Sequence, residues 1–257
     1  MGHARCAPAR AALKYGQRLQ GLMRLESVEG LLFDLDDTIT DFRSASDVAF
    51  AGAFGDVALE HDVPVERMRE VYMGLFEEFY TMHLQGHINL EEFRVYRFSR
   101  MFELLGLPVD ERFLDMCVSF EEVYEDSLRT FPGAMETLVE LEQLYPMGLI
   151  SNGPTDAQWF KVEKFHLDDI FDVVLVSGQI GMAKPDPNIF FVAMAGIRSE
   201  PSNTVMVGNS LEHDFKGAMN AGCRFVWANH LREALPAGWP RPAAVVSSLP
   251  ELRPLLL

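Results

Sequence analysis

The sequence predicts a doubly wound α/β domain on a mainly parallel sheet, with a bundle of helices inserted after the first strand. Five short apolar runs alternate with segments of helical length, which is the pattern of strand-helix-strand units. About a hundred residues separate the first two runs, too many for a single crossover connection. With 257 residues, 48% of them hydrophobic, the chain is long enough for one large domain or two smaller ones.

The predicted strands are short runs of Val, Ile, Leu and Phe that each end at a cluster of Gly, Ser, Asn or Asp. They cover residues 30–33, 147–150, 173–176, 204–207 and 224–227. Runs of this composition are typical of parallel strands that are buried on both faces. Crossover helices are expected after the second, third and fourth runs, and the last of these helices should end at Gly222.

The long segment between the first two strands repeats apolar side chains at spacings of three and four, which predicts amphipathic helices. About four helices are expected, over residues 44–54, 65–82, 90–106 and 113–124. The predicted domains are an N-terminal extension over 1–26, an α/β core formed by 27–41 and 127–257, and a helical cap over 42–126.

Composition restricts the partners. A net charge of −16 repels polyanions, so no nucleic acid is expected to bind. No apolar stretch reaches the ~20 residues of a membrane span, and the three cysteines are too far apart for a disulfide framework or a zinc site. These features favour a soluble cytoplasmic protein, as monomer or homodimer. The basic residues 1–25 are interpreted as a helical extension, a targeting-like segment, or sequence upstream of a start at Met23.

Three carboxylates, Asp34, Asp36 and Asp37, follow the first predicted strand within four positions. In open α/β sheets the ligand binds beyond the carboxyl ends of the strands, so Asp34 and Asp36 are expected to face that crevice. Taken alone, an ordinary acidic turn explains these residues equally well. The residues at the ends of the other strands decide between the two interpretations.

Each later strand ends in a group that complements the carboxylates. Ser151 and Gly153 offer a hydroxyl and backbone N–H groups that suit a phosphate, although an ordinary turn with a helix cap is the alternative. Lys184 could offset the repulsion between an anionic substrate and the aspartates, or be a solvated charge. Asn209 and Asp214 add oxygen ligands of the kind that Mg²⁺ prefers.

The segments "FDLDDT", "LISNG", "GMAKPDP" and "VGNSLEHD", in this order, resemble the four signatures of the haloacid dehalogenase-like hydrolase superfamily. The inserted helices match the position of its helical cap, and the α/β part would be its Rossmann-like core. The second and third signatures are most similar to the branch of pyrimidine nucleotidases and N-acylneuraminate phosphatases. The resemblance implies a Mg²⁺-dependent phosphomonoesterase that acts on a small phosphorylated metabolite.

By this resemblance Asp34 is the nucleophile that becomes an aspartyl phosphate, and Asp36 is the general acid and base. Lys184 offsets the negative charge of the site. Mg²⁺ is expected on a carboxylate oxygen of Asp34, the backbone carbonyl of Asp36, and a side chain of the fourth signature, Asn209 or Asp214. The residues expected to bind substrate are Ser151, Asn152, Gly153 and Thr38, although Thr38 would serve equally well as a turn-stabilising hydroxyl.

Two positions depart from the family pattern. Asp37 stands where glycine is usual and is expected to be solvent-facing or structural. Asn209 stands where aspartate is common, so weaker metal affinity, or a larger share for Asp214, is expected. In the cap, residues 83–89 are the predicted lid tip, with hinges near 40–44 and 126–131. The cap residues that could contact substrate, or instead form a solvated face, are His83, His87, Arg94 and Arg97.

Two other functions stay open at this point. A metal-independent 2-haloacid dehalogenase would use the same nucleophile, but it needs neither Asp36 nor Asp214. A catalytically weak member that binds phosphorylated ligands is suggested by Asn209 alone.

Overall fold

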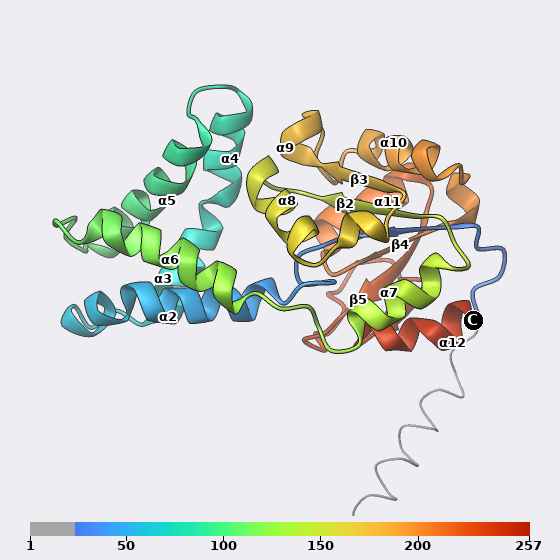
Figure 1. The fold of residues 1–257 in the computed structure, drawn as a ribbon, viewed down its shortest axis with the longest axis horizontal. Helices are drawn as coiled ribbons and strands as arrows, with labels where there is room; N and C mark the ends of the chain where they lie inside the picture. The colour runs from blue at the N-terminus through green and yellow to red at the C-terminus, as the bar shows by residue number, and fades with distance from the viewer. Residues whose placement is uncertain (1–23) are drawn as a thin grey trace, which may run out of the picture.

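The computed structural model describes residues 24–257, which form two lobes (Figure 1). One lobe is a parallel sheet flanked by helices, and the other consists of helices only. The predicted extension over 1–26 lies, apart from its last three residues, outside the described residues. In the part that is described, no helix is both long and apolar enough to cross a membrane.

The sheet has six strands in the order β3-β2-β1-β4-β5-β6, and every pairing is parallel, which confirms the predicted α/β fold class. The strands are β1 (Gly30–Phe33), β2 (Met147–Ser151), β3 (Val173–Val176), β4 (Thr204–Gly208), β5 (Arg224–Ala228) and β6 (Ala244–Val246). Five of them match the predicted apolar runs. The sixth, β6, is a three-residue edge strand that the sequence analysis did not predict.

Helices cover both faces of the sheet, as doubly wound topology requires. The helices of the core lobe are α7 (Ala134–Glu142), α8 (Thr155–Lys164), α9 (Ser177–Ile180), α10 (Pro187–Ile197), α11 (Lys216–Ala221) and α12 (Arg253–Leu256). In β1, Leu31 and Phe33 belong to the hydrophobic cluster that contains α7, α8 and α12, whereas Leu32 belongs to the cluster of α10 and α11. Alternate side chains of one strand thus contribute to two cores.

The helical lobe has its own hydrophobic core. Its helices are α2 (Phe42–Glu60), α3 (Val65–Gly74), α4 (Phe76–Leu84), α5 (Leu90–Leu105) and α6 (Phe113–Ser127). Packed aromatic rings fill the centre, for example Phe50 and Phe120 with centroids 4.9 Å apart. The prediction of one helix over 65–82 was wrong, because the chain breaks into α3 and α4 at Gly74 and Leu75, where glycine weakens a helix.

The two segments that join the lobes run side by side. Thr40 and Thr130 form an antiparallel bridge, the Asp41 amide donates to the Arg129 carbonyl, and the Phe131 amide donates to the Ile39 carbonyl, the last two at 2.9 Å. The entry to the helical lobe and the exit from it are therefore hydrogen-bonded to each other. This paired segment begins at Ile39, three residues after Asp36.

Candidate active site

Asp34, Lys184 and Asp214 meet beyond the carboxyl end of β1. The Lys184 Nζ lies 2.6 Å from Asp34 Oδ1 and 2.7 Å from Asp214 Oδ1, and it also donates to the Ile150 carbonyl at 2.8 Å. All three side chains are buried. Three strand ends thus bring together residues that are 150 and 30 positions apart in the chain. The arrangement is a buried cation between two carboxylates.

Burial and charge act against each other at this centre. Burial, and secondly the charge of Asp214, raise the pKa of Asp34 to about 7, although the Lys184 ammonium and the Thr38 hydroxyl oppose the rise. Burial lowers the pKa of Lys184, but the charges of Asp214 and Asp34 more than offset it, and the net pKa is raised. One lysine therefore does not fully offset the burial of Asp34 and the charge of Asp214, and the pKa of Asp34 stays raised.

Asp36 has a different cation as partner, Lys161 of α8. The Lys161 Nζ lies 2.8 Å from Asp36 Oδ1 and 2.7 Å from Oδ2, and its side chain is only 3% exposed. Thr40 Oγ1 donates to Oδ1 at 3.1 Å and Gln158 Nε2 donates to Oδ2 at 3.3 Å. Sequence reasoning missed Lys161 and Gln158, because polar residues on an amphipathic helix are usually solvated.

The second signature is held in place by other loops. Ser151 Oγ donates to Gln158 Oε1 at 2.7 Å, and Asn152 exchanges two hydrogen bonds with the backbone of Lys184, at 2.8 and 2.9 Å. The Gly153 amide donates to Ser177 Oγ at 2.9 Å. The expectation of a free Gly153 amide is therefore corrected, because a hydroxyl from the end of β3 already accepts its hydrogen. That Ser151 and Asn152 bind substrate stays a prediction.

The turn after β1 is internally bonded. Thr38 Oγ1 donates to Asp34 Oδ2 at 2.8 Å, which orients the carboxylate from the side opposite Lys184. Asp37 adopts a left-handed backbone conformation, with φ of 57°, and its Oδ1 accepts the Arg43 amide at 2.8 Å. Burial raises the pKa of Asp37 to about 6. Asp37 was expected to be either solvent-facing or structural. Its hydrogen bond to the Arg43 amide, at the start of the helical lobe, agrees with the structural expectation.

The carboxylates present fit a hard divalent cation. Asp34 and Asp214 already converge on one positive charge, and a side chain at Gly208 would overlap the Asp214 carboxyl group, so the strand end leaves that carboxyl its space. Within residues 24–257, no three His, Cys, Asp or Glu side chains are assembled as a metal cluster. The Asp36 side chain faces Lys161, and Asn209 lines the cavity that Asp34 and Asp214 also line. Direct ligation by Asn209 stays a prediction.

A cavity of about 330 Å³ lies between the lobes. The core lobe contributes Asp34, Asp36 and Lys184 to its lining, and the helical lobe contributes aromatic residues together with Arg94 and Arg97. The other two candidates from the cap do not line it: His83 contacts the Ile88 carbonyl through Nδ1 at 3.1 Å, and His87 is exposed in the loop between α4 and α5. The two arginines of the helical lobe, and not its two histidines, therefore line the cavity.

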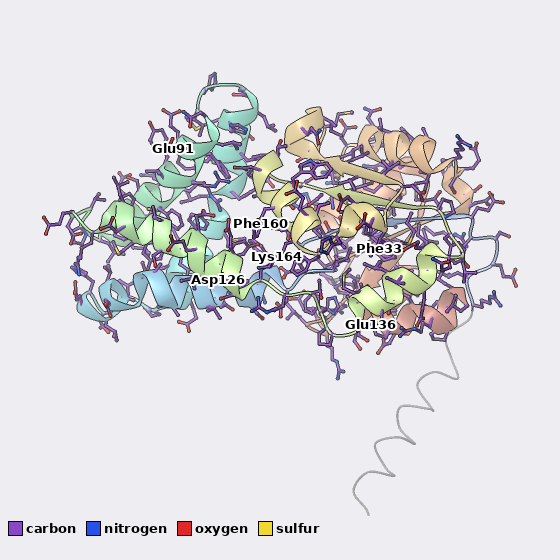
Figure 2. All side chains as sticks on the ribbon, viewed as in Figure 1. Phe33, Glu91, Asp126, Glu136, Phe160 and Lys164 are labelled. Carbon is purple, nitrogen blue, oxygen red and sulfur yellow. The ribbon has the colours of Figure 1, made fainter. Side chains whose placement is uncertain are left out.

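Polar contacts join the lobes around this cavity. Tyr80 Oη of α4 donates to the Gly153 carbonyl at 2.8 Å and lies 2.8 Å from Ser177 Oγ. Arg94 of α5 pairs with Asp156 of α8 at 2.7 Å. Lys164, labelled in Figure 2 beside the end of α6, donates to a backbone carbonyl of that helix. These contacts hold the helical lobe over the strand ends.

This geometry agrees with a family match. A model described as haloacid dehalogenase-like hydrolase matches residues 28–222. The chain belongs to this family. It is therefore a hydrolase, and the four segments that meet around Asp34 are the ones that suggested the family from sequence.

Relatives of this haloacid dehalogenase-like hydrolase include phosphatases. A glyceraldehyde 3-phosphate phosphatase of Pyrococcus furiosus is 29% identical over 205 residues, 79% of this chain and 81% of the relative. The pyrimidine 5'-nucleotidase YjjG of Escherichia coli is 29% identical over 230 residues, 88% of this chain and 96% of the relative. A solved 2-haloacid dehalogenase from Pseudomonas syringae pv. Tomato is 27% identical, with a TM-score of 0.60 over 89% of this chain and 97% of that chain.

Proposed function

We propose that this hydrolase is a Mg²⁺-dependent phosphomonoesterase that cleaves small phosphorylated metabolites through an aspartyl phosphate on Asp34. The observation that carries the proposal is the convergence of Asp34, Lys184 and Asp214 on one cavity that Asp36 also lines. The named activities of the two relatives, phosphatase and nucleotidase, support the same reaction class. The phosphatases among the relatives differ in substrate, so the reaction class is better supported than any one metabolite.

In the first step, a carboxylate oxygen of Asp34 attacks phosphorus and the ester oxygen leaves. Thr38 and Lys184 fix the carboxylate from two sides, which presents it in one orientation. Lys184 and the Ser151 hydroxyl would stabilise the negative charge of the phosphoryl group in transfer. Asp34, the Asp36 carbonyl, and Asp214 or Asn209 would hold Mg²⁺, which supplies positive charge at the phosphate when bound.

In the second step, water attacks the aspartyl phosphate and Asp36 accepts its proton. Asp36 suits this step because four donor contacts fix its carboxylate. The same carboxyl, carrying the proton that it took from water in the preceding turnover, would protonate the leaving alkoxide in the first step. Lys161 is then a positioning residue, because it contacts Asp36 rather than the phosphate.

We infer that residues 42–126 act as a cap over this site, with 27–41 and 127–257 as the catalytic core. The separate hydrophobic core of α2–α6 and the paired linkers support a lobe that can move as one body. Closure over the cavity would exclude water from the phosphoryl group before transfer.

The test is hydrolysis of p-nitrophenyl phosphate with and without EDTA, followed by return of Mg²⁺. We expect activity that EDTA abolishes and Mg²⁺ restores, and no activity in Asp34→Asn. Acid quench of a single turnover should retain phosphate on the wild-type protein, since an acyl phosphate survives mild acid. Equal turnover by wild type and Asp34→Asn would refute the proposal.

The dehalogenase relative makes 2-haloacid dehalogenation the second candidate. That reaction forms an alkyl ester on Asp34 and needs no metal, so the buried Asp214 beside Asp34 and the fixed carboxylate of Asp36 would have no task in it. Release of chloride from chloroacetate in the presence of EDTA would establish it in place of the phosphatase. Binding of phosphorylated ligands without any turnover would instead identify a catalytically weak member.

A further inference from the structure

One cation in the cavity lining has no carboxylate partner: Arg97 of α5. Lys161, Lys184 and Arg94 line the same cavity, and each forms an ion pair with an aspartate at 2.6 to 2.8 Å. For Arg97, no Asp or Glu oxygen of residues 24–257 lies within 4.0 Å. Glu121, which also lines the cavity, is instead paired with Arg94 at 3.8 Å.

The charge of Arg97 is buried and its donors are largely unused. The residue is 5% exposed. Its Nη2 donates to the Tyr72 carbonyl at 3.1 Å, and its buried Nε has no acceptor among the described residues. A guanidinium carries five N–H groups, so one hydrogen bond leaves most of them without a partner in the protein. Burying such a group is costly unless an anion completes its interactions.

Aromatic rings hold the guanidinium in place without neutralising it. Its central carbon lies 3.8 Å from the centroid of Tyr72, 4.9 Å from that of Phe93 and 5.2 Å from that of Phe76. Cation–π contacts use the face of the guanidinium, whereas hydrogen bonds to a carboxylate or phosphate use its N–H edge. The aromatic residues therefore orient Arg97, and acceptors among the described residues occupy only one of its N–H groups.

We propose that Arg97 binds a second anionic group of the substrate, at the end remote from the phosphate that Asp34 attacks. The substrate class is then small phosphomonoesters that carry another carboxylate or phosphate, with the carbon skeleton against the aromatic wall of the cap. This inference rests on the proposed function, since it takes Asp34 as the reacting end. It explains why a buried, unpaired cation is kept in the wall of a cavity whose other cations are already paired with aspartates.

The negative net charge of the protein makes Arg97 important for binding a second anionic group. At −16, the chain as a whole repels a polyanionic substrate, and the charge of Lys184 is already shared between two carboxylates. A second negative group would therefore find attraction mainly at Arg97. Without that attraction, a substrate with an extra negative charge would bind more weakly than its neutral counterpart.

The test uses matched pairs of phosphomonoesters with Mg²⁺: 3-phosphoglycerate against glycerol 3-phosphate, and ribulose 1,5-bisphosphate against ribulose 5-phosphate. The first pair differs by a carboxylate and the second by a phosphate. For the wild-type protein we expect kcat/KM to be roughly tenfold higher, or more, for the more highly charged member of at least one pair. The pair that shows the preference identifies whether the second group is a carboxylate or a phosphate.

Arg97→Met keeps the length and apolar stem of the side chain and removes the charge. We expect it to lower kcat/KM for the preferred ester by roughly 30-fold to 1000-fold, and for its partner by less than about threefold. For Arg97→Lys we expect a kcat/KM for the preferred ester between that of the wild type and that of Arg97→Met. The matched control is Arg100→Met, since Arg100 is on the same helix but is partly exposed, paired with Glu103 and absent from the cavity lining. Thermal unfolding of all three variants monitors folding.

A binding measurement separates this inference from the proposed function. Calorimetric titration of Asp34→Asn with both members of each pair needs no turnover, and Asp34→Asn/Arg97→Met should lose the preference for the more highly charged member. If the wild-type protein hydrolyses no ester but the binding preference depends on Arg97, the phosphatase proposal fails and the anion site stands. Equal losses for both members of a pair, or no preference in either pair, would overturn the anion site.

Discussion

Replacing Asp34 by Asn should stabilise the metal-free protein while it abolishes activity. In the folded protein the pKa of Asp34 is raised from 3.8 to about 7, with burial as the largest cause. A rise of about three units corresponds to on the order of 4 kcal/mol by which the folded state disfavours the ionised carboxyl. Asn removes that charge but loses one hydrogen bond, from Thr38 or Lys184, which costs about 1 kcal/mol.

The pH dependence of this stability difference follows from the raised pKa of Asp34. Between pH 4 and pH 7 the folded state binds more protons at Asp34 than the unfolded state, so the contribution of Asp34 to stability is fully present below about pH 4. It is lost as the pH rises through about 7. In EDTA at pH 8 we expect Asp34→Asn to be more stable than wild type by about 2–3 kcal/mol, and near pH 4 the difference should vanish.

The assay is urea unfolding in EDTA across this pH range. The control is Asp168→Asn, since Asp168 is exposed in a 3-10 turn over Leu167–Asp169, far from Asp34 in the sequence. Adding Mg²⁺ at pH 8 should stabilise the wild type more than Asp34→Asn, because the variant lacks a charged ligand. An Asp34→Asn protein that is less stable than wild type at pH 8 in EDTA, or a difference that does not change with pH, would refute the electrostatic reasoning.

Three further substitutions test the surroundings of the site. Lys161→Met should lower kcat for p-nitrophenyl phosphate by roughly tenfold to 100-fold at nearly constant KM, because Asp36 loses the donor that contacts both its oxygens. Rescue of kcat by Lys161→Arg would exclude a purely structural effect. Tyr80→Phe removes a hydrogen bond between the lobes and should raise KM about fivefold without lowering the melting temperature by more than about 3 °C. Gly153→Ala should lower activity at least about tenfold, because a Cβ at this position would lie 2.5 Å from Gln158 Nε2 and the φ angle of Gly153 is 149°. Unchanged kinetics of this variant would show that the position of Gln158 is dispensable.

The sheet was largely predictable because each of its five longer strands is a local apolar run that ends at a turn cluster. β6 was not, since three residues at the edge of a sheet carry too short a pattern, and Val245 in its centre is exposed. The cap helices were predictable from periodicity, but the break after Gly74 was not. Apolar side chains continue through Leu75, and only the backbone distinguishes one helix from two.

The site was predictable where one residue type serves one purpose at a strand end, as for Asp34 and Lys184. Lys161 was not, because a lysine in a polar stretch of a helix gives no local sign that its Nζ is buried against Asp36, 125 residues earlier in the chain. The amide of Gly153 was misjudged for a related reason. Its acceptor, Ser177, follows a different strand, β3. The spacing of residues along the sequence does not reveal which loops will hydrogen-bond to each other in the folded protein.

The paired linkers also bear on how such an enzyme diversifies. Because Thr40 and Thr130 are bridged, an insertion of almost ninety residues leaves and re-enters the core at nearly one point. Its length and sequence can change without moving the strand ends that carry Asp34 and Lys184. A graft of residues 42–126 from one relative to another therefore has to match this two-stranded junction, together with the contacts of Tyr80, Arg94 and Lys164 between the lobes.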